Sequence, residues 1–244
     1  MIFFKQFKLS VFERFLWLSS LFVIFVTSVC SESVDGLSVI ASLIGATALI
    51  YVAKGVPVGQ FLTVVFSLFY GYISFTFHYY GEMLTYLGMS APIAFLAWFS
   101  WLRNPYQKGR SEVKVRRMSG RNWLFLCVLS VFVTVAFGYV LFLLNTPNLF
   151  WSTVSVTTSF LAASLTFLRS PYYALAYAAN DVILIVLWVL ASVADPGYLP
   201  MVTCFGIFLL NDSYGFYNWK KMQKRQAKKL CKTVKKRKQF ATRY

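Results

Sequence analysis

The sequence predicts an all-α integral membrane protein with eight transmembrane helices, and three observations lead to this prediction. Of the 244 residues, 58% are hydrophobic and only 13% are charged, whereas an average soluble domain is about half apolar and a quarter charged. Apolar runs of about 20 residues recur along the chain, which is the length an α-helix needs to cross a hydrocarbon core about 30 Å thick. The 24 Lys and Arg residues fall between these runs or at the two ends of the chain.

Eight apolar runs meet the length criterion, and they cover residues 13–29, 37–53, 57–78, 82–102, 122–145, 149–168, 171–194 and 198–219. Prolines fall at or near the junctions, where a missing backbone N–H costs little: Pro57, Pro147, Pro171, Pro196 and Pro200. Pro92 instead lies within the fourth run. We expect it to kink that helix or to sit beside an opening in the bundle.

The first run, residues 13–29, has two interpretations. Lys5, Lys8 and Arg14 precede a short apolar segment that ends in TSVCSES, as in a secretory signal peptide. The segment lacks a clean small-x-small cleavage site, which favours a helix that is retained. Either interpretation leaves the rest of the topology unchanged.

The distribution of charge predicts the orientation of the chain. With eight spans, both termini and the even-numbered loops lie on one side of the membrane, and all 24 Lys and Arg residues fall on that side. The opposite loops carry Glu32, Asp35, Glu82 and Asp195. By the positive-inside rule, both termini are cytoplasmic. We expect the basic tail to lie on anionic lipid, with nucleic-acid binding as the less favoured alternative.

A weak internal repeat divides the chain. The segments YVAKGVPVGQF and FLRSPYYAL both begin with an aromatic residue and run through a cation to a proline, and Pro171 lies 114 residues after Pro57. The segments WFSWLRNP and YGFYNWKKM both place a tryptophan before a cation, and Trp219 lies 118 residues after Trp101. The order of these features is the same in both units, although the residue-by-residue match is low.

The repeat predicts a 3+1+3 architecture, with three-helix repeats at 37–102 and 149–221. Between them lie a basic cytoplasmic linker and a linker helix at 103–148, and the chain begins with a helical segment at 1–36 and ends with a basic tail at 222–244. Because three helices and one linker helix make an even number, both repeats enter the membrane from the same side. Parallel repeats of this kind occur in transporters, including the SWEET sugar carriers, and predict a substrate path between the repeats.

Two Asn-Asp dipeptides interrupt the last two apolar runs. Asp181 and Asp212 are the two carboxylates that fall well within the spans, and burial at the bilayer centre costs about 2.5–3.5 kcal/mol on insertion scales. Asn180 and Asn211 both lie about 14–17 Å from the cytoplasmic boundary at 1.5 Å per residue. We predict that at least one asparagine lines a substrate path, and that the aspartates orient the asparagines or anchor helices. The alternative is that the polar pairs only join helices by hydrogen bonds.

Other polar and aromatic residues are weaker candidates for the path. Trp98 and Trp101 lie close to the cytoplasmic boundary, where an aromatic belt is equally expected. Trp188 lies about two turns outward of Asp181 and has lipid contact as an alternative. The remaining candidates are Gln60, Tyr86, Tyr214 and Tyr217.

The sequence contains no enzyme signature, such as G-x-S-x-G, H-E-x-x-H or a P-loop. The four cysteines are scattered singly, and the sole histidine, His78, has no cysteine or carboxylate at ligand spacing. We therefore expect a protein that is not an enzyme and that holds neither a cofactor nor a metal ion.

The segments LAWFSWLRNP, YAANDVILIVLW and FLLNDSYGFYNWKK, taken with the 3+1+3 pattern, resemble the PnuC family of bacterial vitamin transporters. The resemblance covers residues 37–221. It implies a homotrimer in the bacterial inner membrane that imports nicotinamide riboside by facilitated diffusion through alternating access, with the substrate trapped by a cytoplasmic kinase. It also implies that four residues bind the substrate, namely Trp98, Trp101, Asn180 and Asn211.

The residues fit this substrate, although one feature departs from a symmetric site. A cationic ring suits aromatic faces, and an asparagine can both donate to and accept from a carboxamide and hydroxyls. The repeat offsets pair Asn180 with Phe66 and Asn211 with Ile93, so the polar site is one-sided. The alternatives are a carrier of another vitamin such as thiamine or riboflavin, a carrier of a sugar, and a membrane scaffold that transports nothing.

Overall fold

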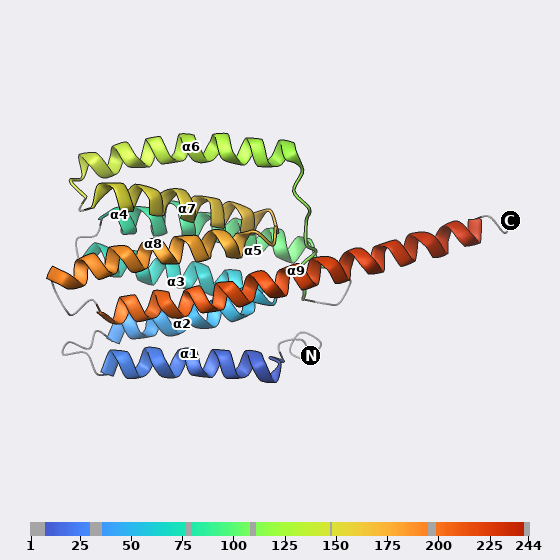
Figure 1. The fold of residues 1–244 in the computed structure, drawn as a ribbon, viewed down its shortest axis with the longest axis horizontal. Helices are drawn as coiled ribbons and strands as arrows, with labels where there is room; N and C mark the ends of the chain where they lie inside the picture. Colours follow the sequence, from blue (N-terminus) through green and yellow to red (C-terminus); the bar gives the residue numbers. More distant parts are fainter. Residues whose placement is uncertain are drawn as a thin grey trace.

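The structure, a computed structural model, describes residues 8–29, 36–76, 80–107, 111–146, 148–194 and 199–241. Its helices are α1 (Val11–Val29), α2 (Gly36–Ala53), α3 (Pro57–Thr76), α4 (Tyr80–Leu84), η2 (Thr85–Ser90), α5 (Ala91–Arg103), α6 (Gly120–Leu143), α7 (Leu149–Phe167), α8 (Tyr173–Ala194) and α9 (Leu199–Ala241). Figure 1 shows them side by side in one bundle, from which the second half of α9 projects at one end. The all-α prediction is confirmed.

Within the described residues, seven helical segments are long and apolar enough to cross a membrane. They are α1, α2, α3, the continuous stretch from α4 to α5, α6, α7 and α8. The eighth expected span corresponds to the first half of α9, a helix of 43 residues that is not among these seven. A multi-pass membrane protein is therefore confirmed, and the eighth crossing stays a prediction.

The fourth expected span is not a continuous α-helix. Between α4 and α5 the chain forms the π-helix η2, from Thr85 to Ser90. Pro92 follows in the first turn of α5 and has no N–H to donate to the preceding helical turn. A π-helical turn is wider than an α-helical one and is often found at functional sites. Here it turns Tyr86 and Ser90 toward the interior of the bundle.

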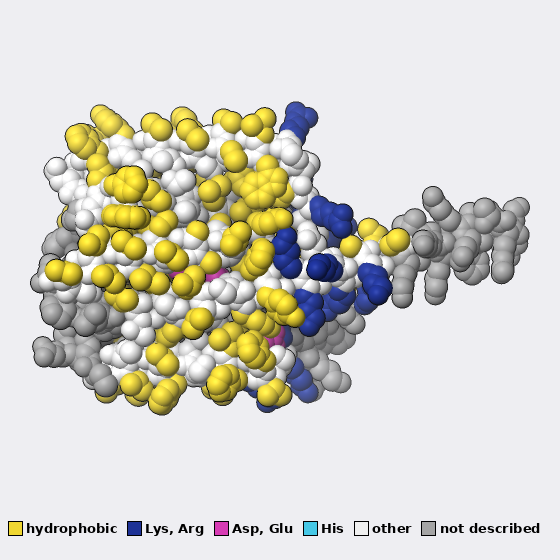
Figure 2. All heavy atoms as spheres, viewed as in Figure 1, with side chains coloured by type: hydrophobic (Ala, Val, Ile, Leu, Met, Phe, Trp, Pro, Cys, Tyr) yellow, Lys and Arg dark blue, Asp and Glu magenta, His cyan; other side chains and the backbone are white. Residues whose placement is uncertain are grey.

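The surface of the bundle separates apolar from basic residues. Hydrophobic side chains cover the length of the bundle in Figure 2, and Lys and Arg side chains gather at the end from which α9 projects. The helices α1 and α6 lie at opposite edges of the bundle in Figure 1, and each buries few of its residues. The other helices enclose the interior between them.

At the basic end, α2 and α7 terminate in the same backbone conformation. Each is followed by one left-handed residue, Gly55 at φ 68° and Arg169 at φ 57°. The N–H of that residue donates to the carbonyl three residues earlier, at 2.8 Å for Gly55 and 2.9 Å for Arg169. The next N–H donates to the carbonyl five residues before it, at 3.0 and 2.9 Å. This is the Schellman helix end, in which glycine is the usual left-handed residue.

Candidate functional site

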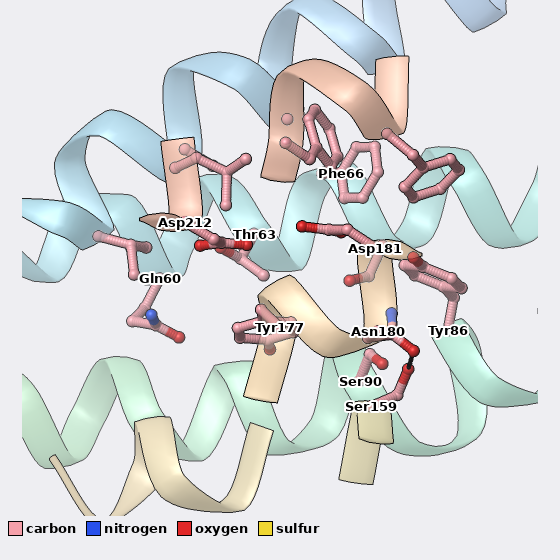
Figure 3. A pocket seen from close by; sticks show the side chains of 17 residues that line it. Gln60, Thr63, Phe66, Tyr86, Ser90, Ser159, Tyr177, Asn180, Asp181 and Asp212 are labelled. Carbon is pink, nitrogen blue, oxygen red and sulfur yellow. Dashed lines mark hydrogen bonds between the residues drawn. The ribbon is translucent and has the colours of Figure 1, made fainter. Parts of the chain in front are cut away.

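A cavity of about 60 Å³ lies among α2, α3, η2, α7, α8 and α9. Figure 3 shows polar side chains that converge on it from several of these helices. The polar lining residues are Gln60, Thr63, Ser67, Tyr86, Ser90, Ser159, Tyr177, Asn180, Asp181 and Asp212. An apolar wall with a few convergent polar groups is typical of a small-molecule site.

The side chain of Asn180 is held by hydroxyl groups of α7. Its Oδ1 accepts hydrogen bonds from Thr158 Oγ1 at 2.8 Å, Ser159 Oγ at 3.0 Å and Ser155 Oγ at 3.3 Å. These three residues share one face of α7 because they are spaced three and four positions apart. In Figure 3 the amide nitrogen of Asn180 points away from Ser159, on the side of Tyr86. Asn180 therefore offers its N–H groups to the cavity.

Two carboxyl groups face the cavity from neighbouring helices. Asp181 on α8 and Asp212 on α9 are each only 3% exposed, and they are close enough to interact electrostatically. Within the described residues, the two ion pairs are Glu13–Lys54 and Glu112–Arg225, so no protein cation neutralises either aspartate. Oδ2 of Asp181 has no hydrogen-bond partner in the part of the chain that the structure describes. Two buried carboxyl groups side by side, with no protein cation, favour a ligand that brings a positive charge or N–H and O–H donors.

Aromatic rings form much of the remaining wall. Tyr86 lies 4.4 Å from Tyr70 and 5.9 Å from Phe66, measured between ring centroids. Phe66 in turn contacts Phe208 at 5.7 Å. Tyr177 enters the cavity from α8 (Figure 3). Such faces can stack on a flat ring and attract a cationic one.

Five of the predicted substrate-binding residues line this cavity, namely Gln60, Tyr86, Asn180, Asp181 and Asp212. Asn180 and Asp181, although adjacent on α8, both reach it. The structure does not bring the other five predicted residues, namely Trp98, Trp101, Trp188, Asn211 and Tyr217, to the cavity.

Trp98 and Tyr217 lie on the outside of the bundle. Trp98 packs against Phe61, Phe95 and Phe99, which are all more than 40% exposed. Tyr217 is 64% exposed. Both side chains sit on helix faces that point away from the cavity, as expected for residues of an aromatic belt.

Trp101 is buried at the basic end of the bundle, where it pairs with Trp219. The two rings lie 5.3 Å apart, and neither side chain is exposed. Nε1 of Trp101 donates to the carbonyl of Thr166 at 3.0 Å, and Nε1 of Trp219 donates to the carbonyl of Val52 at 2.9 Å. The tryptophans therefore bind the ends of α7 and α2.

Asn211 and Trp188 are also buried away from the cavity. Nδ2 of Asn211 donates to Ser20 Oγ on α1 at 3.1 Å and to the carbonyl of Ile207 at 2.9 Å. Because successive helical residues point about 100° apart, Asp212 faces the cavity while Asn211 faces α1. On α9 the aspartate, and not the asparagine, thus reaches the cavity. Trp188 belongs to a buried apolar cluster that also contains Phe205 and Tyr70.

Several residues that line the cavity or hold its side chains in place were not predicted from the sequence. Thr63, Ser159 and Tyr177 line the cavity, and the hydroxyls of α7 hold Asn180. The signal for the hydroxyls was the run STVSVTTS at 152–159, which is rich in serine and threonine for an apolar helix. Glu13, expected at the edge of the first span, is only 5% exposed. Its signal was the capping-box spacing S-x-x-E from Ser10.

The described residues contain no group of three or more His, Cys, Asp and Glu side chains that could hold a metal ion. Several residues that entered the sequence predictions lie outside the described part of the chain, namely Glu32, Asp35, His78 and Asp195.

Comparison with known proteins gives one consistent result. A family model described as nicotinamide mononucleotide transporter matches residues 35–221. The chain is 28% identical over 196 residues to the nicotinamide riboside transporter PnuC of Neisseria mucosa, covering 78% of this chain and 74% of that protein. It is 26% identical over 190 residues to the nicotinamide riboside transporter PnuC of Haemophilus influenzae, covering 78% and 81%.

A solved structure, the crystal structure of the vitamin B3 transporter PnuC, is similar with a TM-score of 0.79 and 26% sequence identity. The similarity covers 90% of this chain and 94% of that chain. The likeness therefore extends over nearly the whole fold.

Proposed function

The chain belongs to the nicotinamide mononucleotide transporter family, and on that premise we propose that it imports nicotinamide riboside by facilitated diffusion. The family and the solved relative are transporters, so the chain is a membrane transporter and not an enzyme. The two curated relatives are named for nicotinamide riboside, which supports that substrate over thiamine, riboflavin or a sugar.

The observation that carries the choice of substrate is the pair of buried carboxyl groups without a protein cation. Asp181 and Asp212 suit the positive charge of a pyridinium ring, and the faces of Tyr86 and Phe66 suit its flat shape. The N–H groups of Asn180 suit the carboxamide oxygen, since Oδ1 is already bonded to α7. Gln60, which also lines the cavity, would contact the ribose hydroxyls.

The proposal includes two parallel three-helix repeats, at 37–102 and 149–221, as the parts that move during alternating access. The equal helix ends at Gly55 and Arg169, which lie 114 residues apart, support the repeat. Cavity residues also recur at this spacing. The pairs are Gly45 and Ser159, Thr63 and Tyr177, Phe66 and Asn180, and Ser67 and Asp181.

The proposal further includes a homotrimer in the bacterial inner membrane, with both termini in the cytoplasm and a kinase that traps the substrate. The gathering of Lys and Arg at the end where α9 projects supports the cytoplasmic assignment of that end. Native mass spectrometry in detergent tests the trimer, and labelling of a cysteine placed in the tail tests the sidedness.

Calorimetry with the purified protein tests the substrate. We expect saturable binding of nicotinamide riboside and no binding of thiamine, riboflavin or glucose under the same conditions. If the folded protein binds one of those compounds but not nicotinamide riboside, the substrate assignment is wrong.

Uptake into liposomes tests the mode of transport. We expect the internal concentration of nicotinamide riboside to rise to the external value and stop there, with or without a proton or sodium gradient. Accumulation above the external concentration when either gradient is imposed would contradict facilitated diffusion.

A further inference from the structure

The helix α1 lies outside the region that the family model matches and lines no part of the cavity, yet buried polar contacts join it to the cavity helices. Ser20, which is 5% exposed, accepts a hydrogen bond from Nδ2 of Asn211 on α9. Trp17 donates through Nε1 to Thr47 Oγ1 on α2 at 3.1 Å. A helix that served only as a membrane anchor would need neither contact.

Glu13 fixes the basic end of α1 against the same two helices. Its carboxylate lies 2.7 Å from Lys54 Nζ after α2 and accepts a hydrogen bond from Tyr214 OH on α9 at 3.0 Å. A capping box completes the helix start: the N–H of Ser10 donates to Glu13 Oε2 at 2.6 Å, and the N–H of Glu13 donates to Ser10 Oγ at 3.2 Å. α1 therefore contacts α9 at two positions along its length: Glu13 bonds Tyr214, and Ser20 bonds Asn211.

The contact between Ser20 and Asn211 involves the residue next to Asp212, whose carboxyl group faces the cavity. Among the described residues, Ser20 supplies the one hydrogen bond that the side chain of Asn211 makes to another helix. Because adjacent residues on a helix are fixed about 100° apart, a bond that holds Asn211 against α1 also fixes the direction of Asp212. Rotation of α9 about its own axis would break the bond to Ser20 and turn Asp212 away from the cavity.

We propose that α1 positions the substrate site: Ser20 holds Asn211, and this contact sets the rotation of α9 that directs the Asp212 carboxyl into the cavity. The inference rests on the proposed function, since it takes Asp212 as part of the substrate site. Ser20 and Asn211 are positioning residues, because neither lines the cavity. α1 thus acts on substrate affinity through α9.

The chain offers a closely matched pair of variants. The hydroxyls of Ser19 and Ser20 both donate to the carbonyl of Leu16, at 3.1 and 2.7 Å, but only that of Ser20 also accepts from Asn211 in the described structure. Ser20→Ala therefore removes the contact to α9, and Ser19→Ala removes an equivalent hydroxyl without it. We expect Ser20→Ala to raise the KM of nicotinamide riboside uptake by about 3- to 10-fold, the effect of one buried hydrogen bond. Ser19→Ala should stay within about twofold of the wild type, and Ser20→Thr, which keeps a hydroxyl, should restore most of the KM.

A double-mutant cycle separates positioning from a general structural effect. The dissociation constant is measured by calorimetry on the monodisperse fraction of Ser20→Ala, Asp212→Asn and the double variant. If Ser20 acts through Asp212, Ser20→Ala weakens binding in the wild type but adds nothing in the Asp212→Asn background. Equal weakening in both backgrounds, or equal behaviour of Ser20→Ala and Ser19→Ala, overturns the positioning role. A wild-type protein that does not bind nicotinamide riboside overturns the proposed function and this inference with it.

Discussion

The two three-helix segments of the bundle, α2 to α5 and α7 to α9, are alike at their ends and different at the cavity. At the basic end each segment has a left-handed helix end, and each supplies a tryptophan that bonds a carbonyl of the other segment. At the cavity, the first segment supplies neutral polar residues such as Gln60 and Thr63, and the second supplies Asp181 and Asp212.

This difference separates what backbone geometry provides from what particular side chains provide. Helix ends and contacts to carbonyl groups depend on backbone geometry, which many sequences can adopt, so two segments of different sequence can share them. The charge and hydrogen-bonding groups of the cavity depend on residue identity at each position. Pairs such as Ser67 and Asp181 keep their place on the cavity wall but differ in chemistry. Under the proposed repeat, similar backbones on the two sides of the cavity would present different groups to the two ends of a substrate.

The largest effect is expected at the pair of Ser67 and Asp181. Asp181→Asn removes a group that can become negatively charged opposite a cationic substrate and should weaken binding of that substrate about 10- to 100-fold, since a hydrogen bond to a charged group contributes about 1.5–3 kcal/mol. Ser67→Ala, the matched change in the first segment, should weaken it by no more than about threefold. Calorimetry measures both, and the neutral dihydropyridine form of the riboside is the control ligand. If Asp181→Asn binds the substrate with wild-type affinity, the charge of Asp181 does not contribute to binding.

The next effect concerns Phe66 and Asn180. Asn180→Leu removes the amide from the cavity and leaves the hydroxyls of Ser155 and Ser159 without their acceptor, so we expect about a tenfold or greater loss of affinity. Phe66→Leu keeps the cavity wall apolar and should lower the affinity for the substrate by a smaller factor. Binding by purified, monodisperse protein checks both. If uptake survives in Asn180→Leu while the protein becomes less stable, Asn180 only joins helices.

A smaller and symmetric effect is expected for the tryptophan pair. Trp101→Phe and Trp219→Phe each remove one buried N–H to carbonyl bond and should each lower the free energy of unfolding by about 0.5–1.5 kcal/mol. Unfolding titrations in detergent compare the two variants directly. Strongly unequal losses of unfolding free energy would show that the two tryptophans do not play equivalent roles, although their hydrogen bonds are alike.

The smallest effect is expected at the two helix ends. Arg169→Gly relieves a non-glycine residue in the left-handed region and should raise the free energy of unfolding by up to about 1 kcal/mol. It also removes a guanidinium whose pKa is lowered by burial and by the nearby Arg116. Gly55→Ala should lower the free energy of unfolding, because Gly55 has a φ of 68°, a left-handed conformation that a residue with a Cβ rarely adopts. Stability titrations check both signs, and a loss in Arg169→Gly would show that the side chain stabilises this end.

The sequence predicts the helices well because each apolar run has a definite length. The expected span at 122–145, for example, corresponds to α6, Gly120–Leu143. It predicts the faces of the helices poorly, because lipid and protein core are both apolar. The periodic pattern that marks the buried face in a soluble protein is therefore missing.

The tryptophans of α5 and the dipeptide of α9 illustrate this limit. Trp98 and Trp101 lie one turn apart on the same helix, and one faces outward while the other is fully buried. Likewise, nothing in the order Asn211-Asp212 indicates which residue faces α1. Asn211 faces α1 because its side chain bonds Ser20, which lies 191 residues away in the sequence.

Because α9 is one continuous helix from the cavity to its projecting end, a small tilt at the cavity becomes a larger displacement at that end. Cys231 is exposed on its projecting half and lies 19 residues beyond Asp212, or about 28 Å along a straight helix. If the helix moves as a rigid rod that pivots at Asp212, a tilt of about 10° displaces Cys231 by about 5 Å. A spectroscopic reporter on this thiol would therefore enlarge, at the end of the bundle where α9 projects, a movement that is barely measurable at the cavity.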